Sequence, residues 1–256
     1  MNQLPRCGPD NFKIESFHWA DAKRKLISAL DFGLSNVSRI DVCSHIFRTL
    51  YYRDIFKCIQ FLLAHLPFQA NLNFVPLPIT DTEGQRIYSE MNTGDWWWNM
   101  QDQLPAGATI VPVICASDKT HLTNFWGNHH SWPLYFTIHN IRKDISCIPE
   151  KRTWILVGPI PCPPKGAKNI DKAWHNMVGT ALSQLTHLDI TGPGLECDCV
   201  DGFQRQCYPL LAAWVRDYLK QVMIAYVSYS SCPMCEIAKG APMWHSTFRP
   251  LDTSRE

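Results

Sequence analysis

Long apolar runs are missing from this sequence, and so is an excess of charge of one sign. No apolar run approaches the roughly 18 residues that a membrane-spanning helix needs. The formal net charge is only +1, which excludes a global basic field, so any nucleic-acid binding would depend on local patches. The first residues, MNQLPRCGPD, contain no apolar signal core. We therefore expect an intracellular protein.

Internal repeats and low-complexity tracts are also absent, and the composition indicates a globular chain. The 256 residues are 46% hydrophobic and 12% aromatic, which is enough to bury a sizeable core in one or two domains. The eleven cysteines are an odd number spread over the whole chain. Without a secretory signal, this pattern favours free thiols and a metal site over a disulfide framework.

Four segments differ in pattern. Residues 1–70 are expected to be mainly helical, because in YYRDIFKCIQFLLAHLPF the apolar residues recur at helical spacing until Pro67. Residues 71–107 form a connecting segment rich in turn residues. Residues 108–230 form the expected core, and residues 231–256 form a tail that contains a Cys-x-x-Cys element.

The core segment reads as three strands, a helix, a fourth strand and a further helix. The strand-like runs are TIVPVICAS, WPLYFTIHNI, RTWILVGPIP and the first part of CYPLLAAWVRDYLKQVMIAYV. Between the third and fourth lies NIDKAWHNMVGTALSQLTHL, a helical pattern with Asn169 as its candidate N-cap. This order predicts an α+β or α/β fold with a mixed sheet and flanking helices. It is also the order of the RNase-H-like fold, which carries catalytic carboxylates on its first strand and at the end of its fourth.

Asp118 and Asp217 occupy those two positions. Carboxylates on separate strands of a rigid sheet could hold the divalent ions of an in-line phosphodiester displacement, and Mg²⁺ prefers oxygen ligands. The alternative is that each aspartate closes its strand as a turn or helix-cap residue.

Several long stretches resemble the Plavaka transposases of fungal mobile elements, which are relatives of the CACTA group. They are YSEMNTGDWWWNMQDQLPAGATIVPVICASDKTHLTNF, WPLYFTIHNI, RQCYPLLAAWVRDY and CPMC. The resemblance implies an RNase-H-like core of the three-carboxylate (DDE) type that acts on DNA with Mg²⁺ or Mn²⁺ in the nucleus. It assigns the first acid to Asp118 and the second to Asp217, with Asp201 as a poorer candidate for the second. The same two aspartates are therefore the expected metal ligands.

The chain also departs from that family. The family's third acid lies beyond its Cys-x-x-Cys element, and no equivalent occurs before Glu256. The family continues its Asp-Tyr pair with Pro-Glu-Gln, whereas here Leu219, Lys220 and Gln221 follow. The turn after Phe125 begins with a tryptophan where the family has glycine. These departures predict a fragment or a decayed copy that is inactive, or active only if a partner supplies the missing acid.

A structural zinc site is predicted near the C-terminus. Cys232 and Cys235 have the spacing of a zinc knuckle, in which two thiolates of one tight turn bind one face of a tetrahedral ion. Spacing alone leaves the remaining ligands open among four residues: Cys197, Cys199, Cys207 and His245. The alternative is a set of unliganded cysteines.

Histidines, basic residues and tryptophans near the first acid are candidates for DNA contacts. The candidates for phosphate contact are Lys119, His121, Arg142 and Lys143, with His129, His130 and Arg216 beside them. The histidines are not expected to be metal ligands, and a solvated surface is the alternative for every residue of this set. The run DWWWNM could stack on unpaired bases, but three consecutive tryptophans cannot share one face, so at least one should be core.

The sequence therefore predicts a transposase-derived domain for metal-dependent DNA cleavage and strand transfer, with Mg²⁺ or Mn²⁺ at the acids and Zn²⁺ at the cysteines. The alternative is a non-catalytic DNA- or protein-binding module left from a decayed transposon. A homo-oligomer is left open, and no membrane partner is expected.

Overall fold

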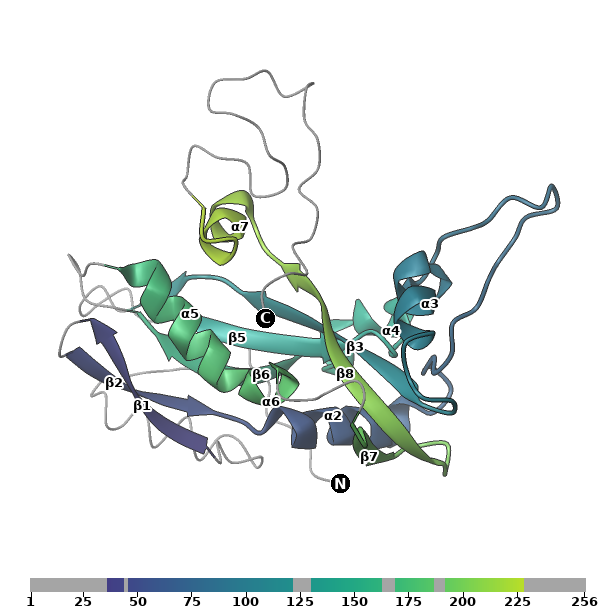
Figure 1. Ribbon diagram of the computed structural model, residues 1–256, viewed down its shortest axis with the longest axis horizontal. Helices are drawn as coiled ribbons and strands as arrows, with labels where there is room; N and C mark the ends of the chain where they lie inside the picture. Colours follow the sequence, from purple (N-terminus) through teal and green to yellow (C-terminus); the bar gives the residue numbers. More distant parts are fainter. Residues whose placement is uncertain (1–35, 44–45, 122–129, 163–168, 187–191, 228–256) are drawn as a thin grey trace, which may run out of the picture.

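The computed structural model describes residues 36–43, 46–121, 130–162, 169–186 and 192–227 (Figure 1). The strands are β1 Asn36–Cys43, β2 Ile46–Tyr52, β3 Thr109–Ser117, β4 Thr120–His121, β5 His130–Ile138, β6 Ile155–Pro161, β7 Leu195–Asp198 and β8 Gln204–Val215. The α-helices are α2 Ile55–Ala64, α3 Asp95–Gln101, α4 Lys143–Ser146, α5 Ile170–Ala181, α6 Ser183–Thr186 and α7 Tyr218–Ile224. Short 3₁₀ helices are η2 Leu66–Phe68, η3 Met91–Thr93 and η4 Pro149–Lys151. None of the helices within the described ranges is long and apolar enough to cross a membrane.

A six-stranded mixed sheet forms the centre of the molecule. Its main path runs β4-β5-β3-β8-β7, and β6 pairs with β5. Strand β5 is antiparallel to both β3 and β6, whereas β8 is parallel to β3. The helix α5 lies between β6 and β8 in the chain, which allows β8 to enter the sheet beside β3 in the same direction. The predicted α+β class with a mixed sheet is confirmed.

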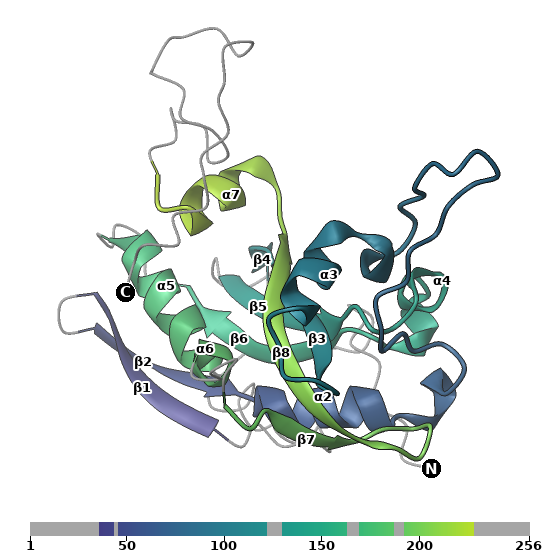
Figure 2. The same cartoon turned by 45° about the vertical axis from the view of Figure 1, so that its right-hand side comes forward.

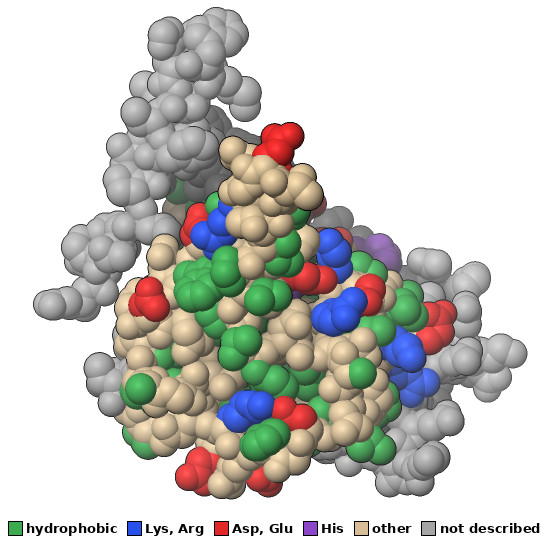
Figure 3. All heavy atoms as spheres, turned by 90° about the vertical axis from the view of Figure 1, so that its right-hand side faces the viewer, with side chains coloured by type: hydrophobic (Ala, Val, Ile, Leu, Met, Phe, Trp, Pro, Cys, Tyr) green, Lys and Arg blue, Asp and Glu red, His purple; other side chains and the backbone are tan. Residues whose placement is uncertain are grey.

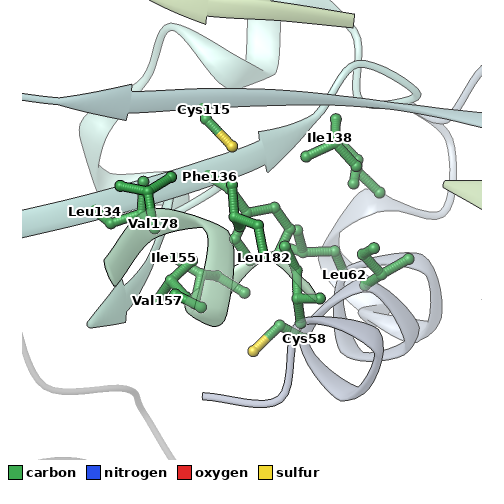
Figure 4. Close-up of a cluster of buried hydrophobic side chains, with 14 of the residues drawn as sticks. Cys58, Leu62, Cys115, Leu134, Phe136, Ile138, Ile155, Val157, Val178 and Leu182 are labelled. Carbon is green, nitrogen blue, oxygen red and sulfur yellow. The ribbon is translucent and has the colours of Figure 1, made fainter. Parts of the chain in front are cut away.

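The two faces of the sheet are covered by different helices. Helices α2 and α5 pack on one face and form the main core with inward-facing residues of β3, β5 and β6 (Figure 4). On the other face, α3 covers a smaller cluster built on Ile110 and Tyr208. The division follows from the alternation of side chains along β3, because Val111 and Val113 belong to the main core and Ile110 belongs to the second cluster.

Helix α2 begins and ends where its sequence pattern predicts. Asp54 caps it by accepting a hydrogen bond from the Lys57 N–H at 3.1 Å, and Pro67 lies in the 3₁₀ turn that follows. The residues that α2 buries recur at helical spacing: Ile55, Cys58, Ile59, Leu62 and Leu63. Leu66, which continues the apolar pattern of the sequence, lies after the helix and is exposed.

The expectation that residues 1–70 are mainly helical is wrong for residues 36–52, which form the β1–β2 hairpin. Helical periodicity exists only in the α2 segment, and the expectation extended it too far along the chain. The sequences NVSRIDVC and IFRTLYY are rich in β-branched and aromatic residues, which favour strands. Residues 1–35 lie outside the described part of the chain.

The connecting segment, residues 71–107, contains the helix α3 and, before it in the chain, a protruding arm (Figures 1 and 2). Thr80 and Arg86 form an isolated bridge near the tip of the arm. In α3, the side chain of Trp97 is fully buried, while Trp96 and Trp98 are partly buried. The prediction that at least one tryptophan of the triple belongs to the core is confirmed.

Gly158 of β6 provides a test of how the hairpin docks on the sheet. A Cβ atom at this position would collide with the carbonyl oxygen of Tyr51 and lie 3.1 Å from the Cα of Tyr52. Both are backbone atoms, which cannot rotate away. We expect Gly158→Ala to lower the free energy of unfolding by about 1–3 kcal/mol, measured by urea denaturation.

Gly179 in α5 is the matched control for this substitution. A Cβ atom there would meet nothing within 4 Å. Gly179→Ala should raise the free energy of unfolding by about 0.5–1 kcal/mol through helix propensity. Equal effects of the two substitutions would show that the hairpin does not pack against β6 as described.

Candidate functional site

Asp118 and Asp217 directly follow the carboxyl ends of two neighbouring parallel strands. Ala116 of β3 pairs with Val215 of β8. If this offset continued for two residues beyond the last pair, Asp118 would be opposite Asp217. Both aspartates are exposed. The structure therefore places the two acids that the sequence singled out just beyond the carboxyl ends of two neighbouring strands.

A bulge in β8 sets this register. Val113 pairs with Leu211, but Ile114 pairs with Ala213, so Ala212 is an extra residue on β8. A shift of one residue reverses which face of the sheet each later side chain occupies. Without this bulge, the acid after β8 would be displaced by one position relative to the acid after β3.

A break in the β3–β5 ladder occurs at Asp118. The short strand β4 pairs with β5 in the same register as β3 does, so β4 continues β3 beyond the break. The position of β5 opposite Asp118 in this register is Pro133, which has no N–H to donate. The Asp118 carboxylate instead accepts a hydrogen bond from the Lys119 N–H at 2.6 Å.

Asp217 also caps α7. Its side chain accepts a hydrogen bond from the Lys220 N–H at 2.8 Å. The helix-cap alternative considered from the sequence is thus realised for Asp217, and it is compatible with metal binding because a carboxylate has two oxygens and several lone pairs.

Lys220 is the central residue that sequence reasoning missed. Its side chain is buried, and its Nζ lies 4.8 Å from the ring centroid of Trp132 and 4.9 Å from that of Trp174. Burial lowers the pKa of Lys220 to about 8, while the negative charges of Asp118, and less strongly of Cys162, Asp217 and Asp171, act to raise it. The ammonium group therefore lies within the electrostatic reach of both candidate acids. In the sequence, a lysine between the apolar residues Leu219 and Val222 could have indicated a buried charge.

Asp201 is remote from this group. It lies in the turn between β7 and β8, at the opposite end of β8 from Asp217. Both of its carboxylate oxygens accept hydrogen bonds from Arg205, each at 2.7 Å. These contacts make Asp201 a structural partner of Arg205.

The predicted DNA-contacting residues fall into two groups. Lys119 is exposed beside Asp118, and His121 lies on β4. Arg142 and Lys143 follow β5, which runs antiparallel to β3, so they lie at the other end of the sheet. A nine-residue strand such as β3 spans roughly 30 Å, so the two groups could contact one DNA duplex but not one phosphate.

Arg142 and Lys143 also have partners within the protein. Arg142 forms an ion pair with Asp144 at 2.9 Å, and the Lys143 Nζ donates to the Ser89 carbonyl at 2.9 Å. The face that contains α3 and the arm shows basic, acidic and hydrophobic side chains intermixed, with no continuous basic field (Figure 3). His129 lies outside the described residues.

The cysteines predicted as zinc ligands are only partly described. Cys232, Cys235 and His245 lie outside the described residues. Cys197, Cys199 and Cys207 are buried together beside α2. A hydrogen bond with Cys207 and the nearby Arg205 lower the pKa of Cys199 to about 7, and contacts with Cys197 and Cys199 raise the pKa of Cys207. Across the ranges that the structure describes, no group of three or more His, Cys, Asp or Glu side chains is arranged to hold a metal ion. The zinc site remains a prediction.

The donor chemistry of the two aspartates fits a hard divalent cation. Both groups supply only oxygen atoms, and both are exposed, so Mg²⁺ could keep most of its water ligands, as it commonly does in proteins. The neighbouring ammonium of Lys220 opposes such binding, because it is a cation within reach of the same carboxylates.

The family model described as Plavaka transposase matches residues 41–247, which is well over half of the chain. The chain belongs to the Plavaka transposase family. The match includes the whole central sheet, both candidate acids and the Cys-x-x-Cys element. Searches of curated proteins and of solved structures gave no match. The resemblance read from the sequence is confirmed at the level of the Plavaka family.

The buried charge of Lys220 leads to a prediction about stability and pH in this Plavaka protein. Because the pKa of Lys220 falls from 10.5 to about 8 on folding, the unfolded chain binds more protons between these two pH values. Burial of the charge therefore costs stability below about pH 8, and this cost disappears as the pH rises through 10.5. We expect Lys220→Met to be more stable than the wild type at pH 7, by on the order of a few kcal/mol, and this advantage to shrink between pH 8 and 10.5.

The measurement is urea denaturation at several pH values, with Lys57→Met as the control. Lys57 is exposed on α2, so its replacement should leave the pH profile of the wild type unchanged. A constant difference between Lys220→Met and the wild type over this range would contradict a buried ammonium group.

Proposed function

We propose that this chain carries two carboxylates of an RNase-H-like DNA-cleaving and strand-transfer site. The observation that carries the proposal is the position of Asp118 and Asp217 at adjacent ends of the parallel pair β3 and β8. The strand order β6-β5-β3-β8, in which β5 alone runs antiparallel to the other three strands, supports the RNase-H-like assignment. Membership of the Plavaka transposase family supports DNA as the substrate.

The two aspartates would hold Mg²⁺ or Mn²⁺ through their exposed oxygens. A bound divalent ion would neutralise charge on the attacked phosphate and lower the pKa of the attacking water or hydroxyl. Asp118 is held by the hydrogen bond from Lys119, and Asp217 is held by its cap of α7. The rigid sheet would thus set the spacing of the acids. Lys119, exposed next to Asp118, would contact the DNA backbone.

The test separates the charge of the acids from their structural role. Asn also caps helices well, so Asp217→Asn should keep α7 while it removes the negative charge. We expect Asp118→Asn and Asp217→Asn each to weaken Mn²⁺ binding by at least about tenfold, measured by calorimetry on the full chain. Any Mg²⁺-dependent nicking of supercoiled DNA by the wild type should disappear in both variants.

Asp54→Asn is the matched control for this experiment. Asp54 caps α2 through the same kind of hydrogen bond but lies at a different helix. This variant should bind Mn²⁺ as the wild type does. Unchanged Mn²⁺ affinity in Asp118→Asn and Asp217→Asn would overturn the proposal.

The second candidate function is metal-independent DNA binding, and Lys220 favours it. The ammonium of Lys220 beside the two acids can substitute for part of the charge that a metal ion would supply. In that case DNA binding should fall with rising salt. It should also be unaffected by Asp118→Ala and by chelation of Mg²⁺.

A further inference from the structure

His121 and His130 face each other across the β4–β5 pair. They are direct register partners on antiparallel strands, and their ring centroids lie 4.1 Å apart with an interplanar angle of 70°. Directly opposite residues of an antiparallel pair have Cβ atoms about 4.5–5.5 Å apart. His121 is exposed and His130 is half-buried. Two imidazoles are therefore held at one accessible position by the backbone.

We propose that His121 and His130 together bind a late first-row transition-metal ion, such as Zn²⁺, Ni²⁺ or Cu²⁺. Neutral imidazole nitrogens are good ligands for these ions, at distances of about 2.0–2.1 Å for Zn²⁺. Binding of a common ion requires one nitrogen of each ring to point toward it. The backbone pairing already fixes the two Cα atoms, so little chain entropy is lost on binding.

The site differs in chemistry from the pair of acids. Two imidazoles fill only two coordination positions, and water or a substrate oxygen would fill the others, as in the open sites of catalytic metals. Asp118 precedes β4 by two residues, so this metal would lie on the same hairpin as the first candidate acid. The ligand class distinguishes the two sites, since Mn²⁺ and Mg²⁺ favour carboxylates whereas Ni²⁺ favours imidazole.

The experiment is a calorimetric titration of the full chain with Ni²⁺. We expect His121→Asn and His130→Asn each to remove one class of binding or to weaken it by at least about tenfold, since loss of even an outer partner of a ligand often costs that much. Cysteines that bind Ni²⁺ contribute equally to the wild type and the variants, so they cancel in the comparison. Circular dichroism checks that both variants fold.

A double-mutant cycle decides whether the two histidines share one ion. If they do, the double variant should lose no more affinity than either single variant. Additive losses, or unchanged binding in either single variant, would overturn the proposal. The control is His65→Asn, because the His65 ring packs between Phe61 and Phe68 instead of facing another imidazole. It should leave Ni²⁺ binding unchanged.

The two metal proposals can fail independently. Asp118→Asn should leave Ni²⁺ binding intact, and His121→Asn should leave Mn²⁺ binding intact. Loss of Ni²⁺ binding in Asp118→Asn would mean that the ion is held by the acid and would overturn the histidine pair as a site of its own.

Discussion

The parallel pairing of β3 with β8 is the interaction on which the rest of the structure depends. It joins two segments nearly a hundred residues apart and connects the antiparallel β3–β5–β6 strands to the β7–β8 hairpin. Side chains from β3 enter both cores, so its position couples the cluster under α2 and α5 to the smaller one under α3. The bulge at Ala212 then sets which residues face each other at the strand ends. A parallel pair needs a long crossover connection, which the segment containing α5 supplies.

Negative charge at the strand ends is partly offset within the protein. Two carboxylates follow the carboxyl ends of β3 and β8. The buried ammonium of Lys220 lies near them and contacts two tryptophan rings. Cation–π contacts offset part of the cost of burying Lys220, and the acids offset a further part. The same arrangement reduces the net negative charge available to a divalent ion. Under the proposed function, the balance between these two effects decides whether the two acids bind a divalent ion.

The family resemblance and the structure contribute different information. Long motifs such as the one around DWWWNM identify the Plavaka family without any knowledge of the fold. The structure explains why some of these residues matter for packing, since Trp97 fills the core under α3. Where the chain has Leu-Lys-Gln after its Asp-Tyr pair, the structure shows the consequence, because Lys220 lies beside the candidate acids.

Sequence alone determined the order of the longer elements β3, β5, β6, α5, β8 and α7, the helix α2 and the two candidate acids, whereas the short strands β4 and β7 were not predicted. These features depend on local periodicity, on strand-length apolar runs and on polar residues at their ends, all of which are visible within short windows. The β1–β2 hairpin was missed because strong helical periodicity nearby was extended to it. Only the tertiary structure decided that the strands before Asp118 and Asp217 are paired in parallel, that Lys220 is buried against Trp132 and Trp174, and that His121 faces His130. The reason is physical: register, bulges and burial arise from contacts between distant segments, and a single residue of slip would have changed every one of these partners.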